Sequence, residues 1–283
     1  MPLTPLPTLL LEPIVRQALI EDLGRAGDIT TDAIAPADRI AAAVMASRQE
    51  GVVAGLEVAA LAFRLIDPAI RFTPVLVDGA RVAPGAPLAR IEGPARGLLS
   101  AERTALNFVS RLSGIASATA SLVASVAHTK ARIVCTRKTT PLLRSLEKYA
   151  VRAGGGANHR FGLDDAVLIK DNHVAIAGGV AEAIRSVRAH VGHMVKVEVE
   201  VDTLAQLEEA LGARVDAVLL DNMSLDDLSR AVAMIGGRAI SEASGRVTPE
   251  TAPAIAATGV DLISVGWLTH SAPILDIGLD VKV

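Results

Sequence analysis

The stretch from Val195 to Gly266 reads VKVEVEVDTLAQLEEALGARVDAVLLDNMSLDDLSRAVAMIGGRAISEASGRVTPETAPAIAATGVDLISVG and repeats one pattern. Short runs rich in Val, Ile, Leu and Ala alternate with longer segments whose apolar residues recur at helical spacing. Most of the short runs are apolar at consecutive positions, which indicates strands that are buried on both faces. Buried strands that alternate with helices predict a parallel sheet covered by helices.

The same alternation begins near Ala131. The predicted strands are residues 132–136, 166–170, 195–201, 217–221, 238–243 and 262–266. Capping residues and prolines predict helix starts at Thr140-Pro141, Asp202, Ser224 and Thr248-Pro249. Six such units predict a barrel that closes or nearly closes. A doubly wound open sheet is the alternative, although no GxGxxG motif follows a strand, which argues against a nucleotide-binding fold of that kind.

The first hundred residues have a different rhythm. Glu12–Leu23 and Glu57–Ile66 carry apolar residues at helical spacing, and short apolar runs that end in turn residues lie between and after them. We therefore predict an α+β arrangement for this half. The last residues, 274–283, alternate like a strand that no helix follows, and we expect this strand to pair with the N-terminal half.

A long helix is expected to join the two halves. Ser100 is its predicted N-cap, and Leu106, Val109 and Leu112 form the predicted buried stripe. Arg103 lies on a different, polar face of this helix. On spacing alone, that face is the solvated side of a connecting helix.

Composition limits the classes of protein to consider. The chain has 283 residues, of which 51% are hydrophobic and only 2% aromatic, so an aliphatic core of one large or two modest domains is expected. The net charge of −3 and the scarcity of aromatic residues disfavour nucleic-acid binding. The N-terminus lacks a basic leader, and no run of 18 uninterrupted apolar residues occurs, so we expect neither a signal peptide nor a membrane span.

Cys135 is the only cysteine, which excludes an intrachain disulfide and a cysteine-based metal cluster. It fits a reducing compartment, and a cytoplasmic location is expected.

The segment from Lys130 to His173 is cationic although the chain as a whole is slightly acidic. It contains nine Lys or Arg and four Asp or Glu, a local balance of +5. The cations do not follow one helical face but lie where apolar runs end. Cations gathered from several segments predict a pocket for a small anion with several charges.

Polar or small residues follow nearly every predicted strand. In chain order these residues are Thr136, Arg137, Lys138, Lys170, Glu200, Asp221, Ser244, Gly245 and Gly266. The carboxyl ends of strands meet at one mouth of an α/β barrel, where ligands bind. Any single residue of this set is more often a loop residue in contact with solvent. Six successive strand ends of this kind make a shared binding site the better interpretation.

The residue types indicate the ligand. Lys and Arg suit phosphates and carboxylates, whereas Glu200 and Asp221 suit sugar hydroxyls or a Mg²⁺ ion that holds phosphate oxygens. Ser244-Gly245 and Gly266 resemble phosphate cradles formed by late strands. Residues 154–156 are all glycine and allow either a close backbone approach or a helix C-cap. Lys170 also leaves open a Schiff base, as in barrel aldolases.

Several motifs resemble one family. They are TRKTTPLLRSLEKYAVRAGGGANHRFGLDDAVLIKDNH at 136–173, GDITTDAI at 27–34, AERTALNFVSRLSGIA at 101–116, KVEVEV at 196–201, LLDNM at 219–223, EASG at 242–245 and SVGWLTHSAP at 264–273. In this order they resemble the quinolinate phosphoribosyltransferases. The resemblance implies an α/β fold of the type II phosphoribosyltransferase kind: an open α/β barrel with an N-terminal α+β sandwich domain. It implies domains at 1–112, joined by the C-terminal strand 274–283, and at 113–273.

The resemblance also implies a reaction and its partners. Phosphoribosyl pyrophosphate and quinolinate are the expected substrates, Mg²⁺ is the expected cofactor, and nicotinate mononucleotide, pyrophosphate and CO₂ are the expected products of this step of de novo NAD biosynthesis. A homodimer or higher homo-oligomer is expected, in which Arg103 completes the site of the neighbouring subunit. This replaces the solvated-face interpretation of Arg103.

The roles of single residues are likewise implied by the resemblance. Arg103, Arg137, His159 and Arg160 would hold the carboxylates, with Thr136 and Lys170 nearby. Lys138, Lys170, Glu200 and Asp221 are the expected catalytic residues and would hold the phosphoribosyl group, with Glu200 and Asp221 as Mg²⁺ ligands directly or through substrate or water. Ser244, Gly245, Arg246, Gly266, Trp267 and His270 would lie on the side of the 5′-phosphate.

Three positions depart from the family pattern. Cys135 stands where Asp is usual, Leu142 where Gly is usual, and Trp267 where a small residue is usual. None of them removes a charged site residue. Two alternatives to the enzyme are a related transferase of the molybdenum-transport-associated branch and a non-catalytic anion-binding protein.

Overall fold

The computed structural model describes residues 3–282, and these form two compact units. The first unit comprises Met1–Ala120, Thr139–Gly155 and Thr269–Val283 within that range. The second unit comprises Ser121–Lys138 and Gly156–Leu268.

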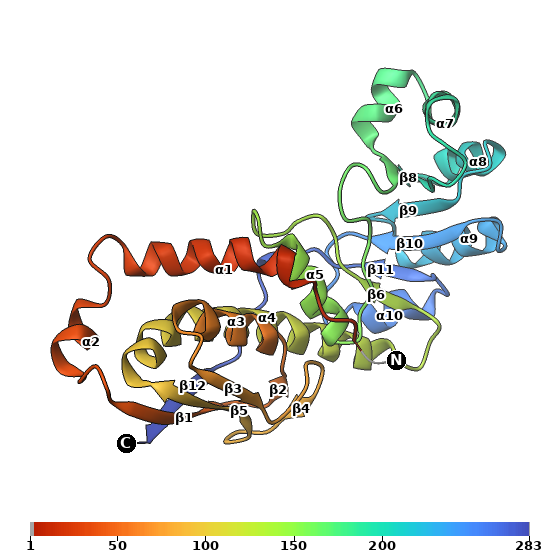
Figure 1. Cartoon of the computed structure of the whole chain (residues 1–283). Coiled ribbons are helices and arrows are strands. Elements are labelled where there is room, and N and C mark those ends of the chain that lie inside the picture. Colours follow the sequence, from red (N-terminus) through yellow and green to blue (C-terminus); the bar gives the residue numbers. More distant parts are fainter. Residues whose placement is uncertain (1–2, 283) are drawn as a thin grey trace. The chain divides into compact units, whose positions relative to one another are not determined.

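The second unit contains the predicted parallel sheet (Figure 1). Its strands are β6 (Arg132–Val134), β7 (Val167–Ile169), β8 (Val197–Val201), β9 (Ala217–Asp221), β10 (Ile240–Ser244) and β11 (Leu262–Ser264). All neighbours pair in parallel in the order β6-β11-β10-β9-β8-β7. The six predicted strands are thus confirmed. In the described chain β6 and β7 do not pair with each other, and the sheet is an open barrel.

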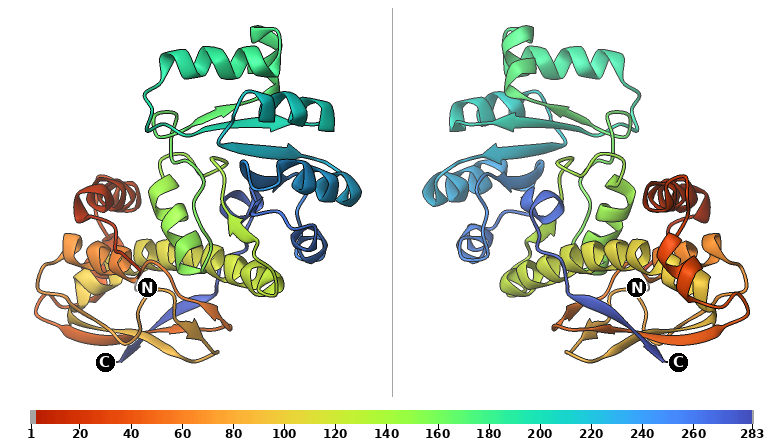
Figure 2. Two further views of the ribbon diagram at one scale, coloured as in Figure 1. Left: turned by 90° about the vertical axis from the view of Figure 1, so that its right-hand side faces the viewer. Right: turned by 90° about the vertical axis from the view of Figure 1, so that its left-hand side faces the viewer.

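Helices follow the strands, and most of them pack against the sheet (Figure 2). Those in contact with strands are α7 (Val180–His190), α8 (Leu204–Gly212), α9 (Leu225–Ile235) and α10 (Ala252–Ala257), whereas α6 (Asp171–Ala177) packs on α7. The central strands β8, β9 and β10 have three consecutive buried residues each, because helices cover one face and the barrel interior the other.

The predicted helix starts are correct in one case out of four. Ser224 caps α9 by accepting a hydrogen bond from the Asp227 amide at 3.1 Å. For α8 the cap is Thr203, one residue after the predicted Asp202, and it forms a capping box with Gln206. The remaining two helices begin after a turn: α10 starts at Ala252 and α5 (Arg144–Ala153) starts at Arg144. Threonine and proline also favour tight turns, so they marked the turn rather than the helix.

The first unit has an antiparallel sheet, β12-β1-β5-β3. Its strands are β1 (Ile40–Ser47), β3 (Arg71–Pro74), β5 (Pro87–Pro94) and β12 (Ile277–Lys282), with a separate short pair of β2 (Gly51–Val52) and β4 (Arg81–Val82). Its further helices are α1 (Thr8–Leu23), α2 (Ile29–Ile34) and α3 (Leu56–Ile66). The C-terminal strand β12 pairs with β1, which is the expected return of the chain end to this half (Figure 2).

Helix α4 (Ala95–Val126) is longer than expected. It starts directly after Pro94, the last residue of β5, and so begins five residues before Ser100. The prediction that Ser100 is the N-cap is therefore wrong, and its hydroxyl donates to Asp28 at 3.0 Å. The predicted stripe of Leu106, Val109 and Leu112 is buried. By length and composition α4 resembles a membrane span, but 61% of its most apolar window is buried, as in a core helix.

The compact units differ from the predicted domains in three respects. The boundary within α4 lies between Ala120 and Ser121 and not between residues 112 and 113. Helix α5 and residues 269–273 belong to the first unit, although both fall within the range predicted for the barrel domain. Gly154 shows why α5 packs so closely in this unit. A Cβ at Gly154 would lie 2.3 Å from the carbonyl oxygen of Ala116 on α4, so only glycine allows the close approach. Gly154 is also the predicted C-cap of α5.

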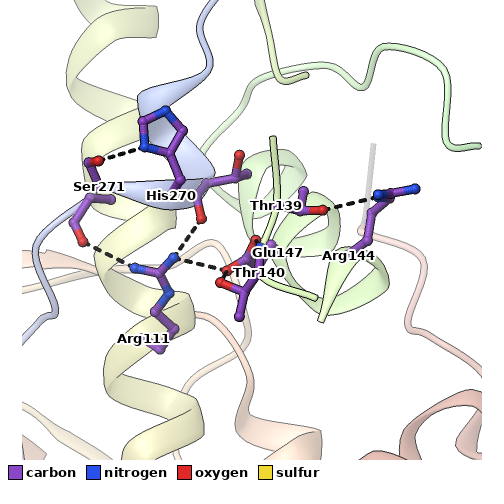
Figure 3. A network of polar contacts seen from close by, with 9 residues as sticks. Arg111, Thr139, Thr140, Arg144, Glu147, His270 and Ser271 are labelled. Carbon is purple, nitrogen blue, oxygen red and sulfur yellow. Dashed lines mark hydrogen bonds and ion pairs between the residues drawn. The ribbon is translucent and has the colours of Figure 1, made fainter. Parts of the chain in front are cut away.

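A buried ion pair fixes the turn before α5 to α4 (Figure 3). The Glu147 side chain is fully buried, and its carboxylate accepts hydrogen bonds from Arg111 Nη2 at 2.9 Å and from the Thr140 amide and hydroxyl at 3.0 and 2.7 Å. Arg111 also donates to the carbonyls of Thr269 at 2.5 Å and Ala272 at 3.3 Å. The network thus connects three separate segments of the first unit.

Replacement of Leu142 by glycine is expected to stabilise the protein by about 1 kcal/mol. Leu142 has φ of 68°, in the left-handed region that costs a residue with a Cβ, and its side chain is 88% exposed, so little packing would be lost. Chemical denaturation of the native protein and the Leu142→Gly variant measures the difference. An equal or lower free energy of unfolding for the variant would contradict this account.

Candidate active site

The carboxyl ends of the barrel strands bring together most of the predicted site residues of the second unit. Thr136, Arg137 and Lys138 follow β6, and Lys170 follows β7. Asp221 and Ser244 are the last residues of β9 and β10, and Glu200 is the last residue but one of β8. Register places Ser244 beside Asp221 on neighbouring strands. Because all six strands run in parallel, these residues lie along the same edge of the sheet, as the sequence predicted.

Two guanidinium groups of the second unit, those of Arg137 and Arg160, are near enough for their charges to interact. Burial lowers the pKa of Arg160, and the positive charge of Arg137 lowers it further. Arg160 Nη1 donates to the Ala166 carbonyl at 3.1 Å, and its buried Nε has no hydrogen-bond partner. Two half-buried guanidiniums that repel each other form a favourable site for an anion with more than one negative charge.

An acidic pair lies beside a lysine on the next strands. Lys170 Nζ is 3.6 Å from Glu200 Oε2, and the two side chains come from β7's end and β8. Burial raises the pKa of Glu200; the charge of Lys170 opposes this shift, and the charge of Asp221 adds to it. The lysine is exposed and faces a carboxylate rather than an apolar wall, which does not favour the Schiff-base interpretation.

The same carboxylates have the donor set of a magnesium site. The charge of Asp221 raises the pKa of Glu200, because the two carboxylates repel each other. Both carboxylates can offer oxygen ligands. Mg²⁺ prefers carboxylate and phosphate oxygens and would offset this repulsion. The residues therefore fit the expected ion.

The predicted phosphate loop after β10 has an unusual backbone. Gly245 has φ of 106°, and a Cβ there would lie 2.2 Å from Asn222 Oδ1, so this position requires glycine. Arg246, with φ of 44°, follows in the left-handed region. The two residues line a surface hollow of about 490 Å³ together with Asn222 and Met223. Trp267, half-buried and next to Gly266, donates from Nε1 to the Val247 carbonyl at 2.9 Å and so fastens the end of the loop.

His159 lies in the barrel interior beside two buried glutamates. Its Nε2 is 2.8 Å from Glu198 Oε2 and 3.6 Å from Glu242 Oε1, and only the first distance is that of a hydrogen bond. One oxygen each of Glu198 and Glu242 is buried without a hydrogen-bond partner. The pKa of Glu242 is raised to about 7, chiefly because the carboxyl group is buried and in addition because of the charge of Glu198.

These three residues also have the types of a metal site, and their ligand atoms lie within 4.8 Å of one another. However, His159 Nδ1 accepts a hydrogen bond from the Arg160 amide at 2.8 Å. A neutral imidazole that accepts at Nδ1 carries its proton on Nε2, so Nε2 has no lone pair for a cation. We therefore assign no metal to this cluster.

Folding stability is expected to fall as the pH rises from about 5 to about 8, by on the order of 2 kcal/mol from Glu242 alone. The pKa of this acid is higher in the folded protein, at about 7, than the ordinary 4.5, so the folded state binds the proton more tightly. The stabilisation is complete below 4.5 and is lost as the pH rises through 7. Urea denaturation across this range, compared with Glu242→Gln, isolates the contribution. Parallel pH profiles for the two proteins would contradict it.

Some predicted residues lie outside this edge or play a different part. Arg103 is exposed on α4, and His270, whose Nδ1 lies 2.6 Å from the Ser271 hydroxyl, ends α11 (Trp267–His270); both belong to the first unit. Cys135 is fully buried, with Sγ 3.3 Å from Asn158 Oδ1. Their predicted roles, and those of the other site residues, remain predictions.

Sequence reasoning missed Glu242, Glu147 and Asn222. A signal was present for Glu242, because a charged residue in the middle of a buried apolar run needs a buried partner. Asn222, which donates to Asp221 at 2.7 Å, and Glu147 had no such signal, since each stands in a segment that is polar in any case.

Comparison with known proteins agrees with this fold. Residues 28–113 match the N-terminal domain of quinolinate phosphoribosyl transferase, and residues 115–280 match its C-terminal domain. The nicotinate-nucleotide pyrophosphorylase [carboxylating] of Mycobacterium leprae is 48% identical, over 94% of this chain and 95% of its own length. A probable enzyme of the same name from Bacillus subtilis is 43% identical, over 96% and 94%.

A solved structure is similar over the whole chain. NadC from Streptococcus pyogenes superposes with a TM-score of 0.95 at 41% sequence identity, over 99% of both chains. The agreement extends over both units and leaves no large part of the chain unmatched. On sequence and structure together, the chain belongs to the quinolinate phosphoribosyltransferase family.

Proposed function

We infer that the protein is a pentosyltransferase that transfers the phosphoribosyl group of phosphoribosyl pyrophosphate to quinolinate, with decarboxylation. The products are nicotinate mononucleotide, pyrophosphate and CO₂, and the reaction belongs to NAD biosynthesis. The observation that supports this best is the arrangement of two guanidiniums, a lysine and an acidic pair along one edge of the barrel. The molybdenum-transport-associated alternative has no observation in its favour.

We propose that the guanidiniums select the acceptor. Quinolinate carries two carboxylates, and Arg137 and Arg160 repel each other until an anion lies between them. Fixing the acceptor in this way orients its ring nitrogen toward the ribose carbon. The loss of translational and rotational entropy is then met on binding and not in the chemical step. Lys138 and Lys170 would bind the phosphate oxygens of the donor.

Glu200 and Asp221 are proposed to stabilise the ribose during transfer. The bond from the ribose carbon to pyrophosphate breaks and leaves positive charge on that carbon, which two nearby carboxylates stabilise. The pair would also hold Mg²⁺, which supplies positive charge to the departing pyrophosphate when bound. The ring nitrogen then forms the new bond to the ribose carbon and becomes a pyridinium.

Decarboxylation follows from the charge of this pyridinium. The bond between the adjacent ring carbon and its carboxylate breaks, CO₂ leaves, and the electron pair remains on the ring carbon. The neighbouring cationic nitrogen stabilises that pair until a proton replaces the carboxylate. The protein's contribution is therefore mostly positioning and electrostatics.

A direct assay tests the function. Purified protein with quinolinate, phosphoribosyl pyrophosphate and Mg²⁺ is expected to form nicotinate mononucleotide, detected by chromatography, and chelation of the metal is expected to stop the reaction. Absence of product at micromolar enzyme would refute the proposal. Product formed equally well after exhaustive chelation would refute the role given to Mg²⁺.

We further propose a homodimer or larger homo-oligomer in which Arg103 of one subunit completes the site of its neighbour. The exposure of Arg103 on α4 supports this arrangement. Inactive Arg103→Ala and inactive Glu200→Gln proteins, mixed under exchange conditions, should regain roughly a quarter of native activity, because half of the dimers are mixed and contain one intact site. No recovery after demonstrated exchange would place Arg103 in its own subunit's site.

A cytoplasmic location is also a proposal. It is supported by Cys135, which is the only cysteine and is buried as a free thiol. Cell fractionation with an antibody to the protein tests it.

A further inference from the structure

The His159 side chain has both ring nitrogens in contact with the protein. Nδ1 accepts from the Arg160 amide at 2.8 Å, and Nε2 lies 2.8 Å from Glu198 Oε2. Since an amide N–H can only donate, Nδ1 must be the acceptor, and Nε2 carries the proton that Glu198 accepts. Both ring nitrogens therefore make hydrogen bonds within the protein.

We propose that His159 and Glu198 are positioning residues, and that Arg160 rather than His159 binds a carboxylate of the acceptor. This differs from the role that the family resemblance implied for His159. The proposal rests on the proposed function, because it concerns the acceptor of that reaction. In this arrangement Glu198 holds the imidazole, the imidazole holds the main chain at Arg160, and the main chain sets the direction of the guanidinium.

The contacts of Arg160 support the proposal that Glu198 and His159 set its position. Its main chain is held at the amide by His159, and its side chain is held at Nη1 by the Ala166 carbonyl, 3.1 Å away. Between these two points, Nε is buried and has no hydrogen-bond partner. A buried donor left without an acceptor costs about 1–3 kcal/mol, and a carboxylate of the ligand would remove that cost. Arg160 is therefore fixed in place and still has a donor to offer.

The glutamates supply a rigid base for the imidazole. Glu198 lies on β8 and Glu242 on β10, with β9 between these two strands. Both side chains lie beside the His159 ring. Glu242 Oε1 lies 3.6 Å from Nε2, so its polar surroundings favour the N–H of the ring at this place. If the ring turned over, carbon atoms would face Glu198 and the Arg160 amide, and both hydrogen bonds would be lost. The environment thus selects one ring orientation.

Nitrogen NMR of the histidines tests the assignment without any reaction. With His159→Asn used to identify its signals, the free protein is expected to show His159 as the neutral tautomer with the proton on Nε2. The same tautomer should persist when quinolinate is added. A proton on Nδ1 in the free protein, or transfer of the proton when quinolinate binds, would overturn the proposal.

Kinetics test the functional consequence. Glu198→Leu is expected to raise the KM for quinolinate by about tenfold or more, the equivalent of one lost hydrogen bond to a charged group, while the KM for phosphoribosyl pyrophosphate stays within about threefold. His159→Ala should have a similar effect, and the double variant should be no worse than either single one. Glu198→Gln, which keeps an acceptor oxygen, should recover most of the affinity.

The opposite results would identify His159 as a direct ligand. An unchanged KM for quinolinate in folded Glu198→Leu, together with a raised KM in His159→Ala, would overturn the proposal. Circular dichroism and thermal unfolding establish that each variant is folded, and the NMR experiment decides the matter if Glu198→Leu is not. Lack of turnover by the native protein would contradict the proposed function instead, and would leave the tautomer measurement as the test of this inference.

Discussion

Replacing Glu200 by glutamine is expected to lower kcat by about a hundredfold or more, with the affinity for quinolinate within about threefold of native. The glutamine keeps the size and the hydrogen-bonding capacity of the side chain but removes its charge. That charge lies 3.6 Å from Lys170 and interacts with Asp221, at the place where positive charge develops on the ribose. The loss should therefore appear in the transition state and not in the binding of the acceptor.

Steady-state kinetics and equilibrium binding of quinolinate, measured without the phosphoribosyl donor, separate the two effects. Glu208→Gln is the matched control, since Glu208 is an exposed residue of α8 outside the strand edge, and native activity is expected for it. If Glu200→Gln lost binding and turnover to the same extent, the site would be that of an anion-binding protein in which catalysis has no separate requirement.

Glu147→Leu is expected to destabilise the protein by about 3–5 kcal/mol, the cost of breaking a buried ion pair by removing one partner. The fully buried Glu147 carboxylate accepts from the Arg111 guanidinium and from both donors of Thr140 (Figure 3). Leucine fills most of the volume but leaves the amide and hydroxyl of Thr140 without this acceptor, and it leaves the Arg111 guanidinium without its buried counter-charge, although the hydrogen bonds of Arg111 to the Thr269 and Ala272 carbonyls remain. The energy is lost because each donor was removed from water on folding and its partner has disappeared.

Denaturation in urea measures this loss, with the slope of the transition used to check that the denatured state is unchanged. Glu182→Leu provides the control on a surface pair, because Glu182 and its partner Arg185 on α7 are both exposed, and less than about 1 kcal/mol is expected. A similar small loss for Glu147→Leu would mean that water reaches the Arg111 guanidinium and that the network has little energetic value.

The existence of six parallel strands was predictable because the signals of a parallel α/β fold are local. Each apolar run needs only five or so neighbouring residues to be recognised, and six of them in a row leave few arrangements. Helix starts were less predictable. Thr140-Pro141 and Thr248-Pro249 have the chemistry of a helix start and of a turn, and only the surrounding chain decides between the two.

For the site, the sequence predicted which residues share an edge of the sheet but not the contacts of each side chain. The polar residues at strand ends share an edge because strand direction alone places them there, which needs no knowledge of distances. The hydrogen-bond partners of each side chain depend on distances that only the tertiary structure gives. His159 has the residue type of a ligand, but its two nitrogens contact Glu198 and the Arg160 amide. That use depends on Glu198, 39 positions away in the sequence.

The sequence by itself thus determined the fold class, the edge of the sheet at which the polar strand-end residues meet, and the family, since periodicity, capping residues and ordered motifs are properties of short segments. Only the tertiary structure decided which charges meet. It placed Glu242 beside Glu198 and His159, and Arg111 against Glu147. The physical reason is that the energy of a buried charge depends on the groups within a few ångströms of it, and folding brings those groups from distant parts of the chain.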